Sequence, residues 1–393
     1  MSPGRSTPSK LLSREFFTLG GCSMLFFFGM GSVTPILSPF VKNELAGSDT
    51  TVGVVIGSFA VSSLVLRAWF GRLGDRRGAR LLMIVGCLVG AAGMGVQLLA
   101  ASLPVVIVSR LLLGAAQAAV MTGSTTLAID LSPVERRGEA SSYILVAFHI
   151  GLGLGPVIGE FVLHHSSYDG VWLMIGLLML GGALVATLLP RRGGAPDAPP
   201  SPLFHPNGVM PGIVIAIGMM SFISFSSFVP LYGEELGLAG VGLVFTLASV
   251  GIALVRLLGG KLPDLLGPIT SSTVALVAIL GGTMVLSAWH AVPGLYLGVV
   301  VVACGGALLM PALIPLVVDG VEPQRRSSAM ATFTMFIDVA VAVTGYMFGV
   351  VADLGGYRAT FVAGGVTAVV GLVVLRMALA PRAYRRREVE LAA

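Results

Sequence analysis

Long apolar runs dominate the chain, and polar residues gather in short stretches between these runs. A helix needs about 20 mostly apolar residues to cross a hydrocarbon core of about 30 Å. The runs are continuously apolar, which favours helices over the alternating pattern of a membrane β-barrel. We therefore predict twelve membrane-spanning helices, at about residues 16–40, 51–70, 81–102, 104–130, 139–163, 170–190, 209–232, 240–259, 270–290, 293–318, 327–352 and 358–380.

A constant shift of 189 residues relates the two halves of the chain. It carries Arg67 to Arg256 and Asp75 to Asp264, within stretches that read RAWFGRLGDRRG and RLLGGKLPDLLG. Two copies of one unit in so apolar a chain are typical of transporters with a site between the copies. The fold class predicted is an all-α membrane protein of two six-helix bundles related by a pseudo-two-fold axis.

A polar stretch rich in proline and glycine separates the halves. Residues 191–207 read RRGGAPDAPPSPLFHPN, a composition that cannot continue a helix. We therefore predict an N-terminal bundle over residues 1–190 and a cytoplasmic linker over residues 191–207. The C-terminal bundle and a short basic tail would occupy residues 208–393.

Composition and charge define the solvent and the orientation of the chain. It is 55% hydrophobic and only 11% charged, where a soluble domain has about 25% charged residues, so the bilayer must be the main solvent. Arginine and lysine concentrate on the side of both termini, whereas the opposite loops offer only Lys42 and Arg358. By the positive-inside rule both termini are cytoplasmic. We expect a multi-pass protein of a cell inner membrane, monomeric, with no nucleic-acid partner.

Three motifs occur in order in the N-terminal half. Residues 71–80 read GRLGDRRGAR, Arg110 begins the stretch RLLLGAAQ, and residues 151–160 read GLGLGPVIGE. The chain resembles the major facilitator superfamily over nearly its whole length, and the third motif is similar to the fifth-helix motif of its drug:proton antiporters. Glu160 departs from that motif, which usually ends in two glycines. The resemblance implies an alternating-access transporter.

The first motif and its repeat are candidates for a conformational latch. The resemblance implies that Asp75 fastens to the opposite bundle when the cytoplasmic side is closed. A carboxylate there could accept hydrogen bonds from the free N–H groups of a helix N-terminus. A solvated basic turn is the alternative reading. The predicted latch residues are Gly71, Asp75, Arg76, Gly78, Arg80 and the degenerate copy Asp264.

Two further helices offer candidates near a central cavity. Arg110 and Gln117 lie two turns apart on the fourth span and share a face, so both could line a cavity. A structural arginine bonded to backbone carbonyls is the alternative for Arg110. On the fifth span, glycines at a spacing of four form a flat ridge for another helix, and a proline favours a bend. The predicted gate residues there are Gly151, Gly155, Pro156 and Gly159.

His149 and Asp338 are ionisable residues in the middle of predicted spans. Each lies ten or eleven residues into its span, which places both near the bilayer midplane. The shift of 189 also carries one to the other. Ionisable residues inside a membrane are costly and usually face a cavity or a partner, and histidine changes charge near neutral pH. We predict that Asp338 and His149 form the proton-responsive part of a central site, with a neutral structural imidazole as the alternative for His149.

Acidic and basic residues recur where the fourth and tenth spans end. They are interpreted as ion-pair clusters that close the inner gate, or equally as interfacial anchors. The residues are Asp130, Arg136, Arg137, Asp319, Arg325 and Arg326.

These features favour a secondary active transporter that exports small amphipathic compounds or metabolites, with protons as coupling ion. A facilitator, or a proton symporter that imports a sugar or organic acid, is the alternative. The first span carries no carboxylate beyond Glu15, which weakens a role in extruding cations. An enzyme is not predicted, because no nucleophile–base pair, metal-ligand cluster or phosphate-binding loop occurs. No cofactor or metal is expected.

Overall fold

In the computed structural model every regular element is a helix, over the part of the chain that the structure describes. The described residues are 13–133, 136–191, 205–258, 265–319, 321 and 326–381. The N-terminal half contains α1 (Arg14–Pro39), η1 (Phe40–Glu44), α2 (Asp49–Arg77), α3 (Ala79–Gln97), α4 (Leu103–Asp130), α5 (Arg137–His165) and α6 (Tyr168–Ala186). The C-terminal half contains α7 (Pro206–Glu235), α8 (Gly242–Leu258), α10 (Pro268–Ala288), α11 (Val292–Val318), α12 (Arg326–Val374) and η4 (Leu375–Leu379).

Twelve helical segments cross the described structure, as the apolar runs predict. Ten helices are long and apolar enough to span a membrane, and α8 is a shorter apolar helix. The twelfth segment arises because α12 bends back on itself at Gly356, whose φ of 74° lies in the region that glycine tolerates best. Residues 326–355 and 357–374 therefore form two spans, and the chain is an integral multi-pass membrane protein.

Local sequence signals define where the helices begin. The hydroxyl groups of Ser13, Ser48 and Ser167 accept hydrogen bonds from backbone N–H groups in the first turns of α1, α2 and α6. Proline opens α7 and α10, where a missing N–H costs nothing. The serine caps satisfy backbone N–H donors that lipid cannot satisfy, and the prolines leave one donor fewer to satisfy.

The first motif forms less of a turn than the sequence suggests. The helix α2 continues through Gly71 to Arg77, and only Gly78, with a φ of 88°, forms the turn to α3. Helical hydrogen bonds therefore persist through the glycines of a membrane helix and break only where a positive φ is required. The sequence places residues 71–80 in a loop between two predicted spans, and this expectation is wrong, because α2 continues to Arg77 and α3 begins at Ala79.

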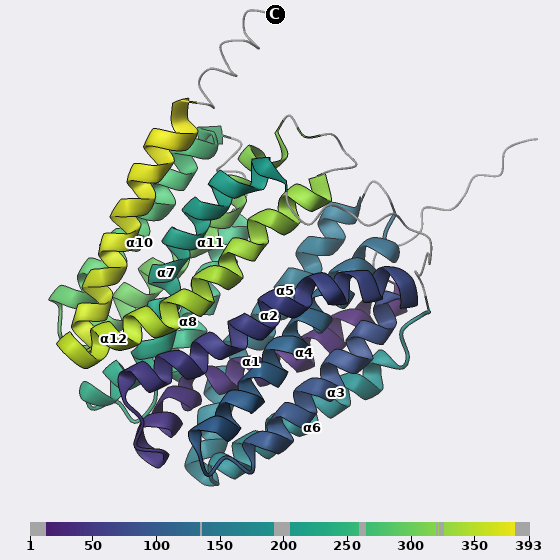
Figure 1. The fold of residues 1–393 in the computed structure, drawn as a ribbon, viewed down its shortest axis with the longest axis horizontal. Helices are drawn as coiled ribbons and strands as arrows, with labels where there is room; N and C mark the ends of the chain where they lie inside the picture. The colour runs from purple at the N-terminus through teal and green to yellow at the C-terminus, as the bar shows by residue number, and fades with distance from the viewer. Residues whose placement is uncertain are drawn as a thin grey trace, which may run out of the picture.

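The helices fall into two groups that lie side by side (Figure 1). Apolar side chains of α1 to α6, including Phe26 and Trp172, form the core of one group. Side chains of α7 to α12, including Phe225 and Phe333, form the core of the other. The first core also includes Phe228 and Leu231 of α7 and Phe348 and Ala352 of α12, so it continues into the contact between the groups.

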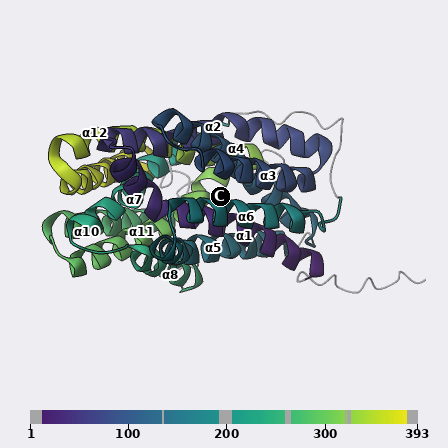
Figure 2. The ribbon, with the colours of Figure 1, turned by 90° about the horizontal axis from the view of Figure 1, so that it is seen from below.

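In the part of the chain that the structure describes, the main contacts between the bundles are those of α1 with α7, α2 with α12, and α5 with α8. Seen from below, α2 and α12 lie along one edge and α5 and α8 along the opposite edge (Figure 2). We call the side at which α1 begins the termini side and the other the far side. The axes of α2 and the first part of α12 approach each other on the far side and spread apart toward the termini side (Figure 1).

Candidate functional site

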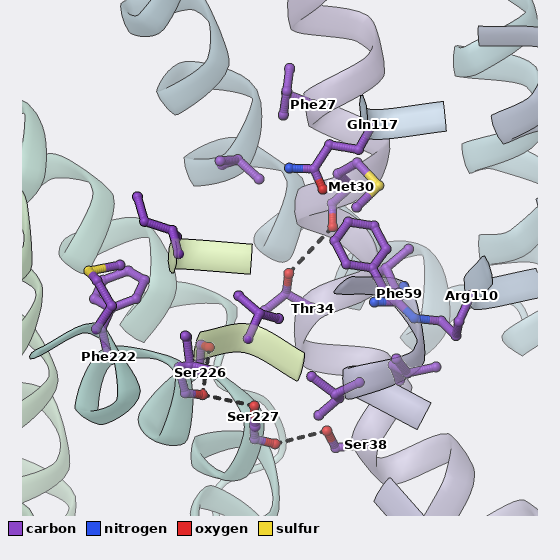
Figure 3. A pocket seen from close by; sticks show the side chains of 18 residues that line it. Phe27, Met30, Thr34, Ser38, Phe59, Arg110, Gln117, Phe222, Ser226 and Ser227 are labelled. Carbon is purple, nitrogen blue, oxygen red and sulfur yellow. Dashed lines mark hydrogen bonds between the residues drawn. The ribbon is translucent and has the colours of Figure 1, made fainter. Parts of the chain in front are cut away.

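A cavity of about 280 Å³ lies between the bundles. Its wall comes from α1, α2, α4 and α5 on one side and from α7 and α12 on the other. Most of the lining is apolar, and it includes Phe27, Met30, Phe59 and Phe222 (Figure 3). A largely apolar pocket with a few polar groups is typical of small-molecule sites.

Arg110 and Gln117 project from α4 into this cavity (Figure 3). Their spacing of seven residues places them on one face of the helix, two turns apart. The Arg110 guanidinium lies over the Phe59 ring, 4.8 Å from its centroid, and Nε and Nη1 are buried without a hydrogen-bond partner. The sequence predicts that both residues line a cavity, and in the structure both belong to the wall of the same cavity.

Serines close the far end of the cavity between α1 and α7. The Ser38 hydroxyl donates to the Ser227 carbonyl oxygen at 2.8 Å, and the Ser227 hydroxyl donates to the Ile223 carbonyl oxygen at 2.8 Å (Figure 3). Ser38 and Ser227 are related by the repeat shift of 189. The two bundles thus meet on the pseudo-two-fold axis through equivalent residues.

Two carboxylates fasten the far side at the other helix pairs. Glu160 of α5 accepts hydrogen bonds from the backbone N–H groups of Val241 and Gly242, both at 2.7 Å, where α8 begins. Asp353 of α12 accepts from Asp49 and Thr50 at 2.8 and 2.9 Å, where α2 begins. Each acid meets the unpaired donors and the positive end of a helix dipole in the opposite bundle.

Small residues allow α2 and α12 to touch along the far half of their interface. A Cβ added to Gly53 would lie 1.9 Å from the Gly345 carbonyl oxygen, and one added to Gly57 would lie 2.9 Å from that of Ala342. Such distances leave no room for any side chain. The backbones are therefore in direct contact, as at other membrane interfaces of small residues.

Asp338 lies in the same interface, nearer to the termini side, and pairs with Arg67. Arg67 Nη2 donates to Asp338 Oδ1 at 3.0 Å, and Nε lies 3.0 Å from Oδ2. The carboxylate is buried, whereas a quarter of the Arg67 side chain remains exposed. Ile337 and Val341, on the same helix as Asp338, contribute to the cavity wall, whereas Arg67 and Asp338 are not among the lining residues described.

His149 lies at the opposite interface, between α5 and α8. Its Nδ1 is 2.6 Å from the Leu145 carbonyl oxygen of its own helix, and the charged side chain near it is Arg256. The structure therefore does not bring His149 and Asp338 together, and neither lines the cavity in the described part of the chain. Arg67 and Arg256 were missed as site residues, although an arginine inside a predicted span is a sufficient signal.

The glycine ridge of α5 packs against α1. A Cβ added to Gly155 would lie 2.5 Å from the Phe28 carbonyl oxygen, and one added to Gly159 would lie 2.9 Å from that of Ser32. Gly151 has similar contacts with α1, and Pro156 lies within α5. The ridge thus joins two helices of one bundle, and its part in gating stays a prediction.

Several predicted residues lie partly or wholly outside the described structure. Arg80 donates to the carbonyl oxygen of Thr187, the residue directly after α6. Arg76 and Arg136 are exposed. Asp130 and Asp319 lie where α4 and α11 end. The latch and the inner ion pairs stay predictions. The side chains outside the description are those of Asp75, Arg137 and Arg326, and the residues wholly outside it are Asp264 and Arg325.

Known proteins resemble the chain over most of its length. The model of the Major Facilitator Superfamily matches residues 19–280 and 212–392. An uncharacterized MFS-type transporter of Salmonella typhimurium is 27% identical over 93% of this chain and 97% of its own. The Escherichia coli (strain K12) MFS-type transporter YhhS, also uncharacterized, is 27% identical over 92% of this chain and 90% of its own.

Solved structures show the same fold at low identity. A variant of the nucleoside transporter NupG superposes with a TM-score of 0.79 at 14% identity, over 92% of this chain and 99% of its own. The human organic anion transporter MFSD10 superposes with a TM-score of 0.71 at 18% identity, over 94% of this chain and all of its own. Their architecture matches the two bundles described above.

Proposed function

Because the chain belongs to the major facilitator superfamily and is a secondary transporter, we propose that it exports small amphipathic compounds or metabolites in exchange for protons. Transport would proceed by alternating access to the cavity between the bundles. The two halves, residues 1–190 and 208–393, would move against each other as domains joined by the linker. A pocket lined by Phe27, Phe222 and a few polar groups suits such substrates.

The Arg67–Asp338 pair carries the proposal of proton coupling. It joins helices of opposite bundles, and Ile337, next to Asp338 in the sequence, lines the cavity. A proton on Asp338 would neutralise the carboxylate and remove its attraction for Arg67, so the α2–α12 interface would be easier to separate. Binding of a proton and opening of the far side would then be linked.

The proposed orientation places both termini in the cytoplasm of a bacterial cell. Arginines 72, 76 and 80 lie at the termini side. On the far side, Lys42 pairs with Asp49, and Arg358 donates to the Ser287 carbonyl oxygen at 2.8 Å. By the positive-inside rule the termini side faces the cytoplasm, and the closed far side faces outward. The structure would then be the inward-facing state of a monomer.

Flux in liposomes tests this function. Purified protein would be reconstituted with a pH-sensitive dye inside, and a panel of neutral, anionic and cationic amphipathic compounds would be added under an imposed pH gradient. Exchange predicts that proton movement opposes movement of the compound and disappears in Asp338→Asn. Asp169→Asn, an exposed carboxylate at the start of α6, serves as the matched control.

Two outcomes would contradict the proposal. Protons and compound moving in the same direction would support the symporter alternative. Flux of compound without proton movement would support a facilitator.

A further inference from the structure

Arg110 provides the charge of the cavity. Eighteen residues line this space, and among these described residues Arg110 is the one with a charged side chain. The other polar members are Gln117, Thr34 and serines. The wall is therefore positive at one point and carries no lining carboxylate to balance it.

The protein leaves the Arg110 charge largely uncompensated. Arg110 is only 7% exposed, and both its Nε and its Nη1 are buried without a hydrogen-bond partner. The Phe59 ring below the guanidinium gives a cation–π attraction, which offsets only part of the cost of burying a charge. Buried charges are normally paired, so a partner that is not part of the described chain is expected here.

The residues around Arg110 indicate what the rest of the ligand is like. Phe27, Met30 and Phe222 give an apolar surface beside Arg110, and Gln117 offers an amide on the same face of α4 (Figure 3). The cavity volume of about 280 Å³ is close to the lower end of small-molecule sites, which begin at about 300 Å³. A compact ligand with one charged end fits this arrangement.

We propose that the cavity binds an amphipathic organic acid whose carboxylate pairs with the Arg110 guanidinium. The planar guanidinium can donate two parallel hydrogen bonds to a carboxylate, and the apolar body of the acid would lie against Phe27 and Phe222. This inference rests on the proposed transport function and narrows its substrate class. Organic cations would be repelled by the same charge.

Equilibrium dialysis with the full chain in lipid nanodiscs tests the pairing. The probes are octanoate, benzoate and 1-naphthoate, each compared with its uncharged amide, with empty nanodiscs as blank. At least one carboxylate is expected to bind at least tenfold more tightly than its amide. Arg110→Gln should lower that affinity at least tenfold and leave the amide unchanged, whereas Arg376→Gln, an exposed arginine on η4, should change neither.

Arg110→Lys provides a second, charge-retaining variant. It should bind the carboxylate more weakly than the native protein, because lysine lacks the planar fork, and more tightly than Arg110→Gln. If Arg110→Gln does not elute as folded protein, the carboxylate-to-amide ratio of Arg110→Lys decides the question. Equal binding of acid and amide, an unchanged affinity in these variants, or no binding of any carboxylate would overturn the inference.

The flux assay separates this inference from the proposed function. Arg110-dependent binding of a carboxylate without proton-linked flux would end the proposal of exchange and leave the binding site in place. Proton-linked flux of neutral or cationic compounds, with no carboxylate binding, would end the inference and leave the exchanger in place.

Discussion

The α2–α12 and α5–α8 interfaces are built from the same positions of the repeat but carry different charges. The shift of 189 turns the contact between Gly57 and Ala342 into the contact between Thr246 and Gly153. In the first, the backbones touch. In the second, the Thr246 hydroxyl donates to the Gly153 carbonyl oxygen at 2.7 Å. The geometry of packing is thus preserved while its chemistry changes.

The difference is greatest where the repeat places an arginine. Arg67 meets a carboxylate, Asp338, whereas its repeat mate Arg256 meets an imidazole, His149. Arg256 Nε is buried without a hydrogen-bond partner. One interface is therefore held by an ion pair that a proton can break, and the other has no such pair at the equivalent position. We interpret the first as the coupling interface of the proposed exchanger.

Loss of the ion pair should have the largest effect. Asp338→Asn removes the counter-ion of Arg67. Breaking a fully buried pair costs about 3–5 kcal/mol, and the lower end is expected here because a quarter of the Arg67 side chain is exposed. Thermal unfolding in detergent should show this loss, and proton-linked flux should fall to the liposome background.

The double variant Arg67→Gln/Asp338→Asn sharpens this test. It should recover most of the stability, because no unpaired charge remains, but not the proton coupling. A double variant that still couples protons would remove the pair from the mechanism.

The backbone contact should give the next largest effect. Gly53→Ala forces a methyl group against the Gly345 carbonyl oxygen, and overpacking of this kind costs about 1–3 kcal/mol. Gly21→Ala, with open space around its Cβ position, is the matched control and should unfold as the native protein does. Equal unfolding temperatures of these two variants would contradict the described approach of α2 and α12.

The far-side carboxylates should differ from each other. Glu160→Gln weakens two hydrogen bonds and the interaction with the α8 dipole. The closed far side should lose about 1–2 kcal/mol of stability, which corresponds to roughly tenfold more of the outward-open state. Asp353→Asn should act in the same direction but less strongly, because Asp353 is exposed.

Labelling of a cysteine at the buried Ser38 measures this change. In each background, Ser38→Cys would be treated with an impermeant maleimide from the far side, and the parent without that cysteine gives the blank. Unchanged labelling rates in both variants would show that the carboxylates do not hold the far side closed.

Giving the α5–α8 interface an ion pair like that of the α2–α12 interface should have the smallest effect. His149→Asp places a carboxylate near Arg256 and recreates the charges of the Arg67–Asp338 pair. A gain of up to about 1 kcal/mol in stability and slower flux are expected, because a second pair would have to separate in each cycle. His149→Asn controls for loss of the imidazole, and faster flux in His149→Asp would argue against equivalent roles of the two positions.

The part of the site that depends on residue spacing within one helix could be predicted from the sequence. Arg110 and Gln117 were assigned to a cavity because their spacing places them on one face, and the structure finds both in its wall. Repeat symmetry places Asp338 and His149 at corresponding positions of the two halves, and the sequence predicts that both belong to one central site. Pairing across the bundles depends on which helices are neighbours, and α12 adjoins α2, so Asp338 meets Arg67.

The sequence by itself determined the solvent, the twelve helices and the duplication, since hydropathy and repeat spacing are properties read along the chain. Only the tertiary structure decided that Glu160 caps α8, that Asp338 pairs with Arg67 and that Arg110 is the one charged residue among the described residues that line the cavity. The physical reason is that a buried charge is stabilised by whatever atoms lie within a few ångströms, and those atoms come from helices distant in the sequence.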